Sequence, residues 1–212
     1  MILTQPIADA LLFAARKHAG QHRKGASRAP YMRHLTDVAA RLYGAGVRDE
    51  KLLQAALLHD TLEDTATTYD ELAERFGADV ADLVLEVTIP PEVKERGGWA
   101  GANYQLAQVP NASPRARVLK AADQLANVAE LLADPPPAWD AERRAGYMAK
   151  ATALLLRIVA GAYRTEPTMG LEFRGIIDEE PELERLRRHA GAGIEQHYLP
   201  GAHLYATTEP QA

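Results

Sequence analysis

The chain has 212 residues, 47% of them hydrophobic and 25% charged, which is typical of one folded domain with a modest extension and excludes a disordered, collagen-like or coiled-coil protein. Its formal net charge of −5 argues against bulk binding to nucleic acid or to an anionic membrane. Because the sequence contains no cysteine, disulfides and thiolate metal sites are excluded, and histidine and carboxylate side chains remain as the strong metal ligands.

The first part of the chain predicts two amphipathic helices joined by a loop. Apolar residues recur there at three- and four-residue spacings, which is the pattern of a helix with one buried face. The first helix is expected to begin near Thr4, and the second runs through Leu42 and stops near Gly44. Between them, residues 20–30 are rich in Gly, Ser, Ala and basic residues and predict a loop.

Helical patterns continue through the rest of the chain. A wide apolar face precedes the run His59-Asp60-Thr61-Leu62-Glu63-Asp64, and two short helices are expected at residues 69–76 and 78–87, separated by Gly77. Ser113 and Pro114 are a good N-cap and first-position pair for a long helix that ends at the three prolines of residues 135–137. Residues 141–162 predict a last long helix.

The predicted fold class is all-α, with helices packed around one core, because no segment alternates apolar and polar residues as a strand would. We expect residues 1–165 to form the domain and residues 166–212 to form a C-terminal extension containing a short charged helix. A loop-like insertion at residues 89–100 is expected to border a site, since long loops in compact domains are often functional.

The run that follows the third apolar segment carries a candidate metal motif. In one continuous helix, His59, Asp60, Glu63 and Asp64 would share a face. Like charges held that close repel one another unless a cation lies among them, so the pattern indicates a metal site. The alternative interpretation is a solvated acidic helix face with a lone histidine.

Other residues strengthen the metal hypothesis. Asp123 and Asn127 lie four apart at the border of the long helix's apolar stripe, and His34 lies beside a core position, where it is alternatively a satisfied core histidine. Together His34, His59, Asp60 and Asp123 offer two imidazoles and two carboxylates. This mixed set suits manganese, iron or zinc with open positions for water, and ligand hardness favours manganese.

A local concentration of positive charge accompanies this motif. Between residues 10 and 36 the sequence has six basic residues and no acidic one. The alternative is a solvated basic face, but a metal site beside a basic loop indicates phosphate chemistry. No Gly-rich phosphate loop followed by Lys-Ser or Lys-Thr is present, and no Gly-x-Ser-x-Gly elbow, which excludes nucleoside triphosphate motors and serine hydrolases of that type.

An ordered set of motifs carries a family resemblance. The set comprises His18-Ala-Gly-Gln21-His-Arg23-Lys24-Gly, Pro30-Tyr31-Met-Arg-His34, Ala55-Ala-Leu-Leu-His59-Asp60-Thr-Leu-Glu63-Asp64-Thr and Lys120-Ala-Ala-Asp123-Gln-Leu-Ala-Asn127. Over about residues 4–160 the chain resembles the hydrolase domain of the RelA/SpoT family, within the His-Asp (HD) phosphohydrolase superfamily. It most resembles the small alarmone hydrolases, which include the metazoan SpoT homologues. The resemblance implies an HD-domain helical bundle without the synthetase domain of long family members.

The resemblance also implies roles for ten residues. A manganese ion would be held by His34, His59, Asp60 and Asp123. The attacking water would be positioned and deprotonated by Glu63 and Asp64. The nucleotide would be bound by Arg23, which stacks on the guanine, by Lys24 near the phosphates, and by Tyr31 and Asn127.

The implied reaction is manganese-dependent removal of the 3′-pyrophosphate from guanosine tetra- or pentaphosphate, (p)ppGpp, giving GDP or GTP and pyrophosphate. The segment at residues 89–105 departs from the family pattern and keeps only Lys94 and Arg96 as basic residues. An alternative is therefore an HD phosphohydrolase acting on another phosphorylated nucleotide, for example the 2′-phosphate of NADPH. A lesser alternative is a non-catalytic nucleotide-sensing module, against which the intact Glu63 and Asp64 argue.

These inferences also bear on partners and location. The expected partner is a small guanosine nucleotide, and no binding to nucleic acid or to a membrane is expected. The sequence leaves the oligomeric state open, and a homo-oligomer is one of the alternatives. No secretory leader pattern occurs at the N-terminus, which carries Asp9 among its apolar residues. We therefore expect a cytoplasmic protein.

Overall fold

The computed structural model describes residues 3–97 and 99–165, with side chains described as far as residue 158. The predicted extension at residues 166–212, with its short charged helix, lies outside the described residues. Within the described part, regular structure is helical except for one isolated bridge between His22 and Pro30. The all-α prediction is therefore confirmed.

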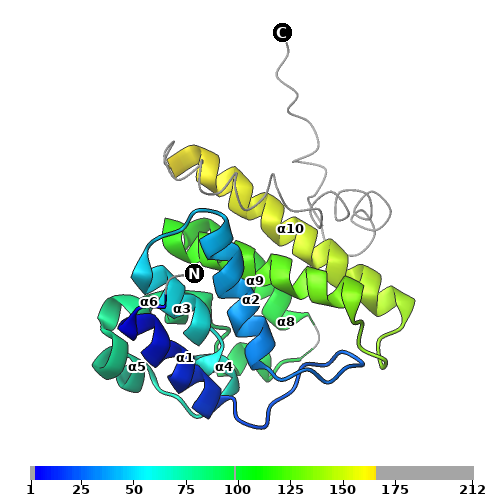
Figure 1. Cartoon of the computed structure of the whole chain (residues 1–212). Coiled ribbons are helices and arrows are strands. Elements are labelled where there is room, and N and C mark those ends of the chain that lie inside the picture. Colours follow the sequence, from blue (N-terminus) through cyan, green and yellow to red (C-terminus); the bar gives the residue numbers. More distant parts are fainter. Residues whose placement is uncertain (1–2, 98, 166–212) are drawn as a thin grey trace.

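Most elements follow one another with short connections, whereas a long loop of residues 18–31 joins the first two helices, as Figure 1 shows. In chain order they are α1 (Gln5–Lys17), α2 (Met32–Gly44), α3 (Glu50–Leu58), α4 (Thr61–Asp64), α5 (Tyr69–Phe76), α6 (Ala78–Val87), α7 (Pro91–Lys94), α8 (Ala100–Gln108), the 3₁₀ turn η1 (Val109–Asn111), α9 (Pro114–Ala133) and α10 (Ala141–Thr165). Local sequence signals account for several of these bounds. Gly77, with a positive φ of 87°, separates α5 from α6, and the Ser113 hydroxyl caps α9 by accepting a hydrogen bond from the Ala116 N–H.

Helix α3 lies at the centre of the core. It packs against α1, α2, α6 and α9, and all of its residues from Leu52 to Leu58 are buried. A helix that is buried on every side needs apolar residues on every side, and this segment supplies them with Leu and Ala. Its C-terminal end therefore delivers the next residue, His59, into the interior, where the exposed fraction of that residue is only 3%.

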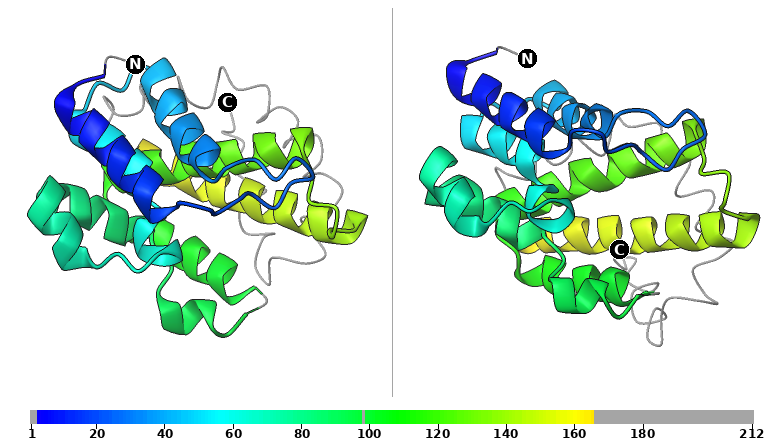
Figure 2. Two further views of the ribbon diagram at one scale, coloured as in Figure 1. Left: turned by 60° about the horizontal axis from the view of Figure 1, so that its bottom comes forward. Right: turned by 90° about the horizontal axis from the view of Figure 1, so that it is seen from below.

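Helix α9 lies between α2 and α10, as the views in Figures 1 and 2 agree. Because helices pack against α9 on two sides, most of its length is buried. Its buried residues include the polar side chains of Arg117, Lys120, Asp123 and Gln124. Buried polar groups need hydrogen-bonding or ionic partners, so these residues indicate a functional site rather than packing alone.

The structure differs from the sequence prediction at the His-Asp run. One continuous helix was expected there, but α3 ends at Leu58 and α4 begins at Thr61, with His59 and Asp60 in a turn between them. The Thr61 hydroxyl donates a 2.6 Å hydrogen bond to the Leu58 carbonyl oxygen and satisfies one group that the helix break exposes. The four residues of the motif therefore do not share one helix face.

The insertion at residues 89–100 contains α7 and leads into α8, which the sequence analysis did not predict. Pro91 occupies the first turn of α7, where its missing N–H removes no hydrogen bond. Helix α8 has few large apolar residues, and Ala102, Gln105 and Leu106 are its buried ones. The insertion does border a site, as expected, because the Ile89 N–H and the Lys94 side chain both contact the residues of α4.

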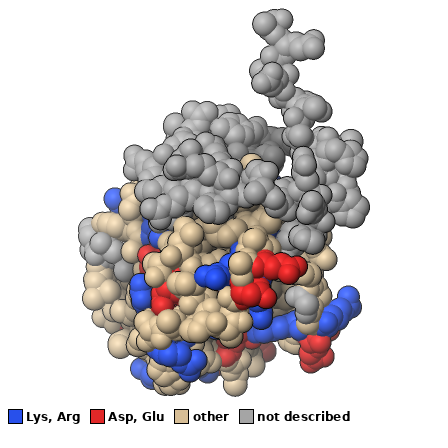
Figure 3. All heavy atoms as spheres, turned by 90° about the vertical axis from the view of Figure 1, so that its right-hand side faces the viewer, with Lys and Arg blue, Asp and Glu red and all other residues tan. Residues whose placement is uncertain are grey.

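The charged surface is mixed in sign. Figure 3 shows the face at which α9 ends and α10 begins, and over its described part acidic and basic side chains lie interspersed among uncharged ones. Among the described residues, no helix is both long enough and apolar enough to cross a bilayer.

The central position of α3 gives a stability prediction. Leu57 is fully buried, so Leu57→Ala should lower the free energy of unfolding by about 2–5 kcal/mol, because it leaves a cavity among close-packed helices. The matched control is Leu85→Ala on α6, where the side chain is 52% exposed and the loss should stay within about 0.5 kcal/mol. Urea denaturation measures both values. Equal losses in the two variants would contradict the central role of α3.

Candidate metal centre

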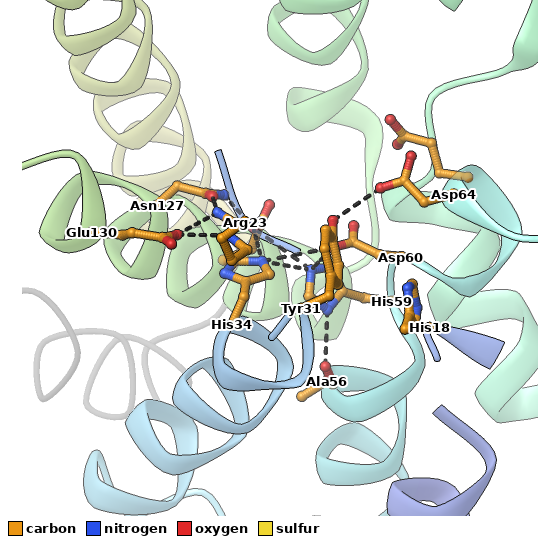
Figure 4. Close-up of polar contacts among 12 residues, drawn as sticks. His18, Arg23, Tyr31, His34, Ala56, His59, Asp60, Asp64, Asn127 and Glu130 are labelled. Atoms are coloured by element: carbon orange, nitrogen blue, oxygen red, sulfur yellow. Dashed lines mark hydrogen bonds and ion pairs between the residues drawn. The ribbon is translucent and has the colours of Figure 1, made fainter. Parts of the chain in front are cut away.

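Two histidines face each other at the centre of the molecule. His34 lies in the first turn of α2 and His59 directly after α3, and their Nε2 atoms are 3.3 Å apart. The Nδ1 of His59 lies 2.8 Å from the Ala56 carbonyl oxygen, which can only accept a hydrogen bond. Nδ1 therefore carries a proton, and Nε2 is the ring atom that faces His34 and that would offer its lone pair to a metal. Figure 4 shows this convergence.

Two carboxylates complete the cluster. Asp60 Oδ2 lies 3.2 Å from Nε2 of His59 and 3.6 Å from Nε2 of His34. Asp123 Oδ1, from the middle of α9, lies 3.2 Å from Nε2 of His34 and 3.6 Å from Nε2 of His59. The structure thus brings together all four residues that the sequence analysis proposed as ligands.

The electrostatics of this cluster call for a cation. Burial alone would lower the pKa of His59, but the carboxylates of Asp60 and Asp123 outweigh burial and raise that pKa to about 10. Burial alone would raise the pKa of each carboxyl, yet the imidazoles, and for Asp123 also the Lys120 ammonium, hold both pKa values well below their ordinary range. The site therefore binds positive charge strongly.

A divalent metal ion fits this donor set. One donor atom each from His34, His59 and Asp60 lie within 4.8 Å of one another, and Asp123 adds a fourth donor close to both imidazoles. Imidazole nitrogen together with carboxylate oxygen is the ligand mixture of divalent transition ions. The Nδ1–H of His59 bound to a carbonyl is the outer hydrogen bond that commonly orients a metal-ligating histidine.

Two polar side chains on α9 hold Asp123 in place. The Lys120 ammonium lies 2.9 Å from Asp123 Oδ2, and the Asn127 amide donates a 2.6 Å hydrogen bond to Asp123 Oδ1. Burial opposes the charge of Lys120, but the Asp123 carboxylate raises its pKa, so the lysine stays protonated. Sequence reasoning assigned no role to Lys120, although its spacing of three residues from Asp123 on one helix signals the contact.

Glu63 and Asp64 contact the insertion rather than the imidazoles. Glu63 Oε2 accepts a 3.1 Å hydrogen bond from the Ile89 N–H, and the Lys94 ammonium lies 2.5 Å from Asp64 Oδ1. The break between α3 and α4 causes this separation, which corrects the expectation of one crowded helix face. Burial raises the pKa of Glu63, and the Ile89 N–H and the nearby lysines oppose only part of that rise.

Tyr31 links the two acidic groups. Its hydroxyl lies 2.8 Å from Asp60 Oδ2 and 2.9 Å from Asp64 Oδ2, and its ring is stacked on His18 at a centroid distance of 4.7 Å. Burial, and then the two carboxylates, raise the pKa of Tyr31 far above its ordinary value, so the phenol keeps its proton. Tyr31 thereby holds a metal-ligand candidate and Asp64 at a fixed spacing.

Glu130 and Asn127 bind the edge of the Arg23 guanidinium group. Its Nε and Nη2 lie 2.7 Å and 2.6 Å from Glu130 Oε2, and Nη2 also donates a 2.6 Å hydrogen bond to Asn127 Oδ1. The guanidinium lies over the Tyr31 ring, 5.2 Å from its centroid. Figure 4 shows Arg23, Asn127 and Glu130 in this arrangement. Glu130 was missed by sequence reasoning, although its spacing of seven residues from Asp123 places both on one face of α9.

An open cleft of about 430 Å³, which we call the first cleft, lies beside the metal centre. Its walls include polar residues of the predicted site together with two aromatic rings, namely Arg23, Lys24, Tyr31, Asp64, Asn127, Glu130, Trp139 and Tyr147. All four residues predicted to bind a nucleotide thus lie at one cleft. Its size and its mixture of rings with a few polar groups are typical of small-molecule sites.

Comparison with known proteins places this geometry in a family. The sequence matches the HD domain family over residues 10–146. It is 43% identical over 142 residues to the Homo sapiens guanosine-3′,5′-bis(diphosphate) 3′-pyrophosphohydrolase MESH1, covering 65% of this chain and 75% of that protein. The Mus musculus protein of the same name is 37% identical over 178 residues, covering 82% of this chain and 93% of that protein.

A solved structure gives the same result in three dimensions. The structure of a metazoan orthologue of SpoT that hydrolyses ppGpp superposes with a TM-score of 0.72 at 31% identity, covering 86% of this chain and 99% of that one. Matches in sequence and in fold therefore agree over the region that contains the four clustered donors. The chain belongs to the HD-domain family and, within it, to the MESH1/SpoT-like group.

Proposed function

We propose that the chain is a metal-dependent guanosine 3′,5′-bis(diphosphate) 3′-pyrophosphohydrolase, which converts (p)ppGpp to GDP or GTP and pyrophosphate. The observation that carries this proposal is the convergence of His34, His59, Asp60 and Asp123 beside the first cleft. The 3′-pyrophosphohydrolase activity for which the MESH1 relatives are named supports the substrate. The proposed catalytic domain is residues 1–165, with residues 166–212 as an extension. A cytoplasmic location belongs to the proposal and rests on the cysteine-free composition.

Mn²⁺ is the proposed metal, because half of the four donors are carboxylate oxygens, which manganese accepts readily together with imidazole. When bound, the ion supplies Lewis-acid activation of water and neutralises charge on the phosphoryl oxygens. Asp60 and Asp123 keep their negative charge at neutral pH, because nearby cationic groups hold the pKa values of both low. Lys120 and Asn127 orient Asp123 so that Oδ1 faces the imidazoles.

Glu63 is the proposed proton acceptor. Water attacks the phosphorus that carries the ribose 3′ oxygen, and the bond between that phosphorus and the 3′ oxygen breaks. The water proton passes to a Glu63 carboxylate oxygen, and Glu63, directly or through solvent, returns a proton to the 3′ oxygen, which leaves as the ribose hydroxyl. A carboxylate with a raised pKa is a better base, and burial raises the pKa of Glu63. Asp64, held by Tyr31 and Lys94, is placed to orient the same water.

The nucleoside is proposed to lie in the first cleft. Arg23 offers a flat guanidinium face to the guanine, since Glu130 and Asn127 hold its edge rather than its face. Asn127 and Tyr31 border the same cleft, and the exposed Lys24 supplies a positive charge for phosphate groups.

A second candidate function is hydrolysis of another phosphorylated nucleotide by the same centre. The observation that favours it is the segment at residues 89–105, which departs from the family pattern. In this segment α7 places Lys94 against Asp64, and Trp99 lies at the start of α8. A substrate panel separates the two candidates. Turnover of ppGpp supports the first, and turnover of a different nucleotide with ppGpp left intact supports the second.

The division of roles between ligands and base gives the first prediction of this section. Asp123→Ala should lose bound Mn²⁺, because one of four ligands is removed. Glu63→Gln should keep the metal and lower kcat by about 10²–10⁴-fold, because the proton acceptor is removed. Metal content by mass spectrometry and product formation by anion exchange measure both, with Glu74→Gln, an exposed glutamate on α5, as the control. Equal metal loss in the Asp123 and Glu63 variants would refute this division.

The pKa of Glu63 gives a pH prediction. A base must be deprotonated, so kcat/KM should fall as the pH drops through the pKa of Glu63, which lies above that of an ordinary glutamate. Lys94 helps to lower this pKa, so Lys94→Met should move the acid limb of the profile to higher pH. Steady-state kinetics from pH 4 to pH 9 measure the limb. A limb that moves to lower pH in Lys94→Met, or one that persists unchanged in the residual activity of Glu63→Gln, would argue against Glu63 as the base.

The contacts of Glu130 and Asn127 with Arg23 give a third prediction. Glu130→Gln should raise KM for ppGpp about 10-fold with kcat nearly unchanged, because Arg23 loses its charged partner and its fixed orientation. Arg23→Ala should raise KM at least as much, and the double variant should be no worse than Arg23→Ala alone, because the two residues act as one unit. Additive effects of the two substitutions on KM would show that Glu130 acts independently of Arg23.

A further inference from the structure

The loop of residues 18–31 carries Arg23 and Lys24, which line the first cleft. Figure 2 shows this loop reaching the end of α9 in both views. The loop folds back on itself as a hairpin, in which the Arg23 N–H donates a 2.8 Å hydrogen bond to the Ala29 carbonyl oxygen. Residues 25–28, which we call the loop tip, lie beyond this bond and contact the end of α9.

Asp134, the residue that caps the C-terminal end of α9, binds the loop tip. Its Oδ2 accepts a 2.5 Å hydrogen bond from the Ser27 hydroxyl, and its Oδ1 accepts a 3.2 Å hydrogen bond from the Ser27 N–H. The bond from the Ser27 hydroxyl is the main cause that holds the pKa of Asp134 below its ordinary value. Asp134 is therefore a carboxylate at neutral pH, and hydrogen bonds to a charged acceptor are stronger than those between neutral groups.

The backbone of the loop tip is shaped by this contact. Gly25 is buried, and a Cβ at this position would lie 2.6 Å from the Asp134 carbonyl oxygen, which is too close for two such atoms. Only glycine therefore allows the loop tip to lie this near the helix end. At the other end of the tip, Arg28 has a φ of 53°, a conformation that side chains other than glycine rarely adopt. Such a backbone persists only where surrounding contacts impose it.

Helix α9 contacts the loop on both sides of Lys24. Glu130 and Asp134 lie one helical turn apart, and the Asp134 N–H donates a 2.7 Å hydrogen bond to the Glu130 carbonyl oxygen. Glu130 pairs with Arg23, and Asp134 pairs with Ser27. Lys24 lies between these two fixed residues in sequence. Its backbone is therefore held relative to α9, the helix that also carries a metal-ligand candidate.

We propose that Asp134 is a positioning residue for nucleotide binding. Through Ser27 it holds the loop tip, and the held loop fixes Arg23 and Lys24 at the first cleft. The hydrogen bonds of Asp134 reach the loop and α9 rather than the metal centre, so its loss weakens binding and spares the chemical step. This inference rests on the proposed function for the identity of the nucleotide.

Limited proteolysis tests whether Asp134 holds the loop. Trypsin cleaves after basic residues, and the loop offers it Arg23, Lys24 and Arg28. Asp134→Ala should be cut at these bonds at least about 10-fold faster than the wild type, because a loop without its anchor opens more often. Asp134→Asn should stay within about threefold of the wild type, because its amide oxygen still accepts a hydrogen bond from Ser27. Mass spectrometry of the fragments identifies the bonds that are cut.

A second variant and a matched control accompany this test. Gly25→Ala should also be cut faster, because the added methyl group pushes the loop tip away from Asp134. Asp82→Ala on α6 removes an exposed aspartate that accepts a 2.7 Å hydrogen bond from the Tyr69 hydroxyl, and it should be cut at the wild-type rate. An unchanged midpoint of thermal unfolding shows that each variant is folded. Wild-type rates for both Asp134→Ala and Gly25→Ala would overturn the proposal.

Steady-state kinetics test whether the held loop matters for the nucleotide. Asp134→Ala should raise KM for ppGpp at least about fivefold with kcat within about threefold, because binding is lost while the chemical step is kept. Asp134→Asn should restore most of the wild-type KM. A merely structural role would lower the amount of active protein, and hence kcat, without moving KM. Faster proteolysis of Asp134→Ala with an unchanged KM would overturn the positioning role.

A binding measurement separates this inference from the proposed function. Calorimetry measures the affinity of the full chain for GDP, which Asp134→Ala should lower by about the same factor as it raises KM. If ppGpp is hydrolysed but Asp134→Ala changes neither proteolysis nor KM, the positioning role fails and the function stands. If ppGpp is not hydrolysed but Asp134→Ala is cut faster and binds GDP more weakly, the function fails and the positioning role stands.

Discussion

The convergence of two imidazoles and two carboxylates in the interior is the constraint on which the rest of the structure depends. His34 and His59 are almost completely buried, and their Nε2 atoms lie only 3.3 Å apart. Asp60 and Asp123 bring negative charge into the same small volume. Buried charges of this kind are tolerated only when they are paired or bind a metal, so the cluster and its cation must be understood as one unit.

The helices are arranged so that this unit is rigid. Helix α3 is buried on every side and ends at the position of His59, while α9 is held between α2 and α10 and carries Asp123 at its centre. Around the cluster, hydrogen bonds continue outward from Asp123 through Asn127 and Arg23 to Glu130, and from Asp60 through Tyr31 to Asp64. These chains couple the metal centre to the cleft where the nucleotide is proposed to bind, and the chain through Arg23 joins segments more than 100 residues apart in sequence.

Local signals in the sequence predicted the helices that carry the site, because Gly77, Ser113 and Pro114 impose their structure on immediate neighbours. The four residues proposed as ligands converge in the structure, as expected from their places beside apolar stripes that face the core. The break between α3 and α4 was not predicted, because no Gly or Pro marks it and the Thr61 hydroxyl closes it instead. The role of Glu130 depends on Arg23, a distant residue that only the folded chain brings next to it, and helical periodicity alone does not reveal this contact.

We propose that His34, His59, Asp60 and Asp123 hold a divalent ion that the chain needs to hydrolyse ppGpp. The most direct measurement strips the purified protein with a chelator, restores Mn²⁺, and follows the products of ppGpp by anion exchange. GDP and pyrophosphate are expected from the reloaded protein, and no reaction is expected from the stripped protein. Equal cleavage by both forms, or intact ppGpp with a protein shown to contain one Mn²⁺ per chain, would contradict this proposal.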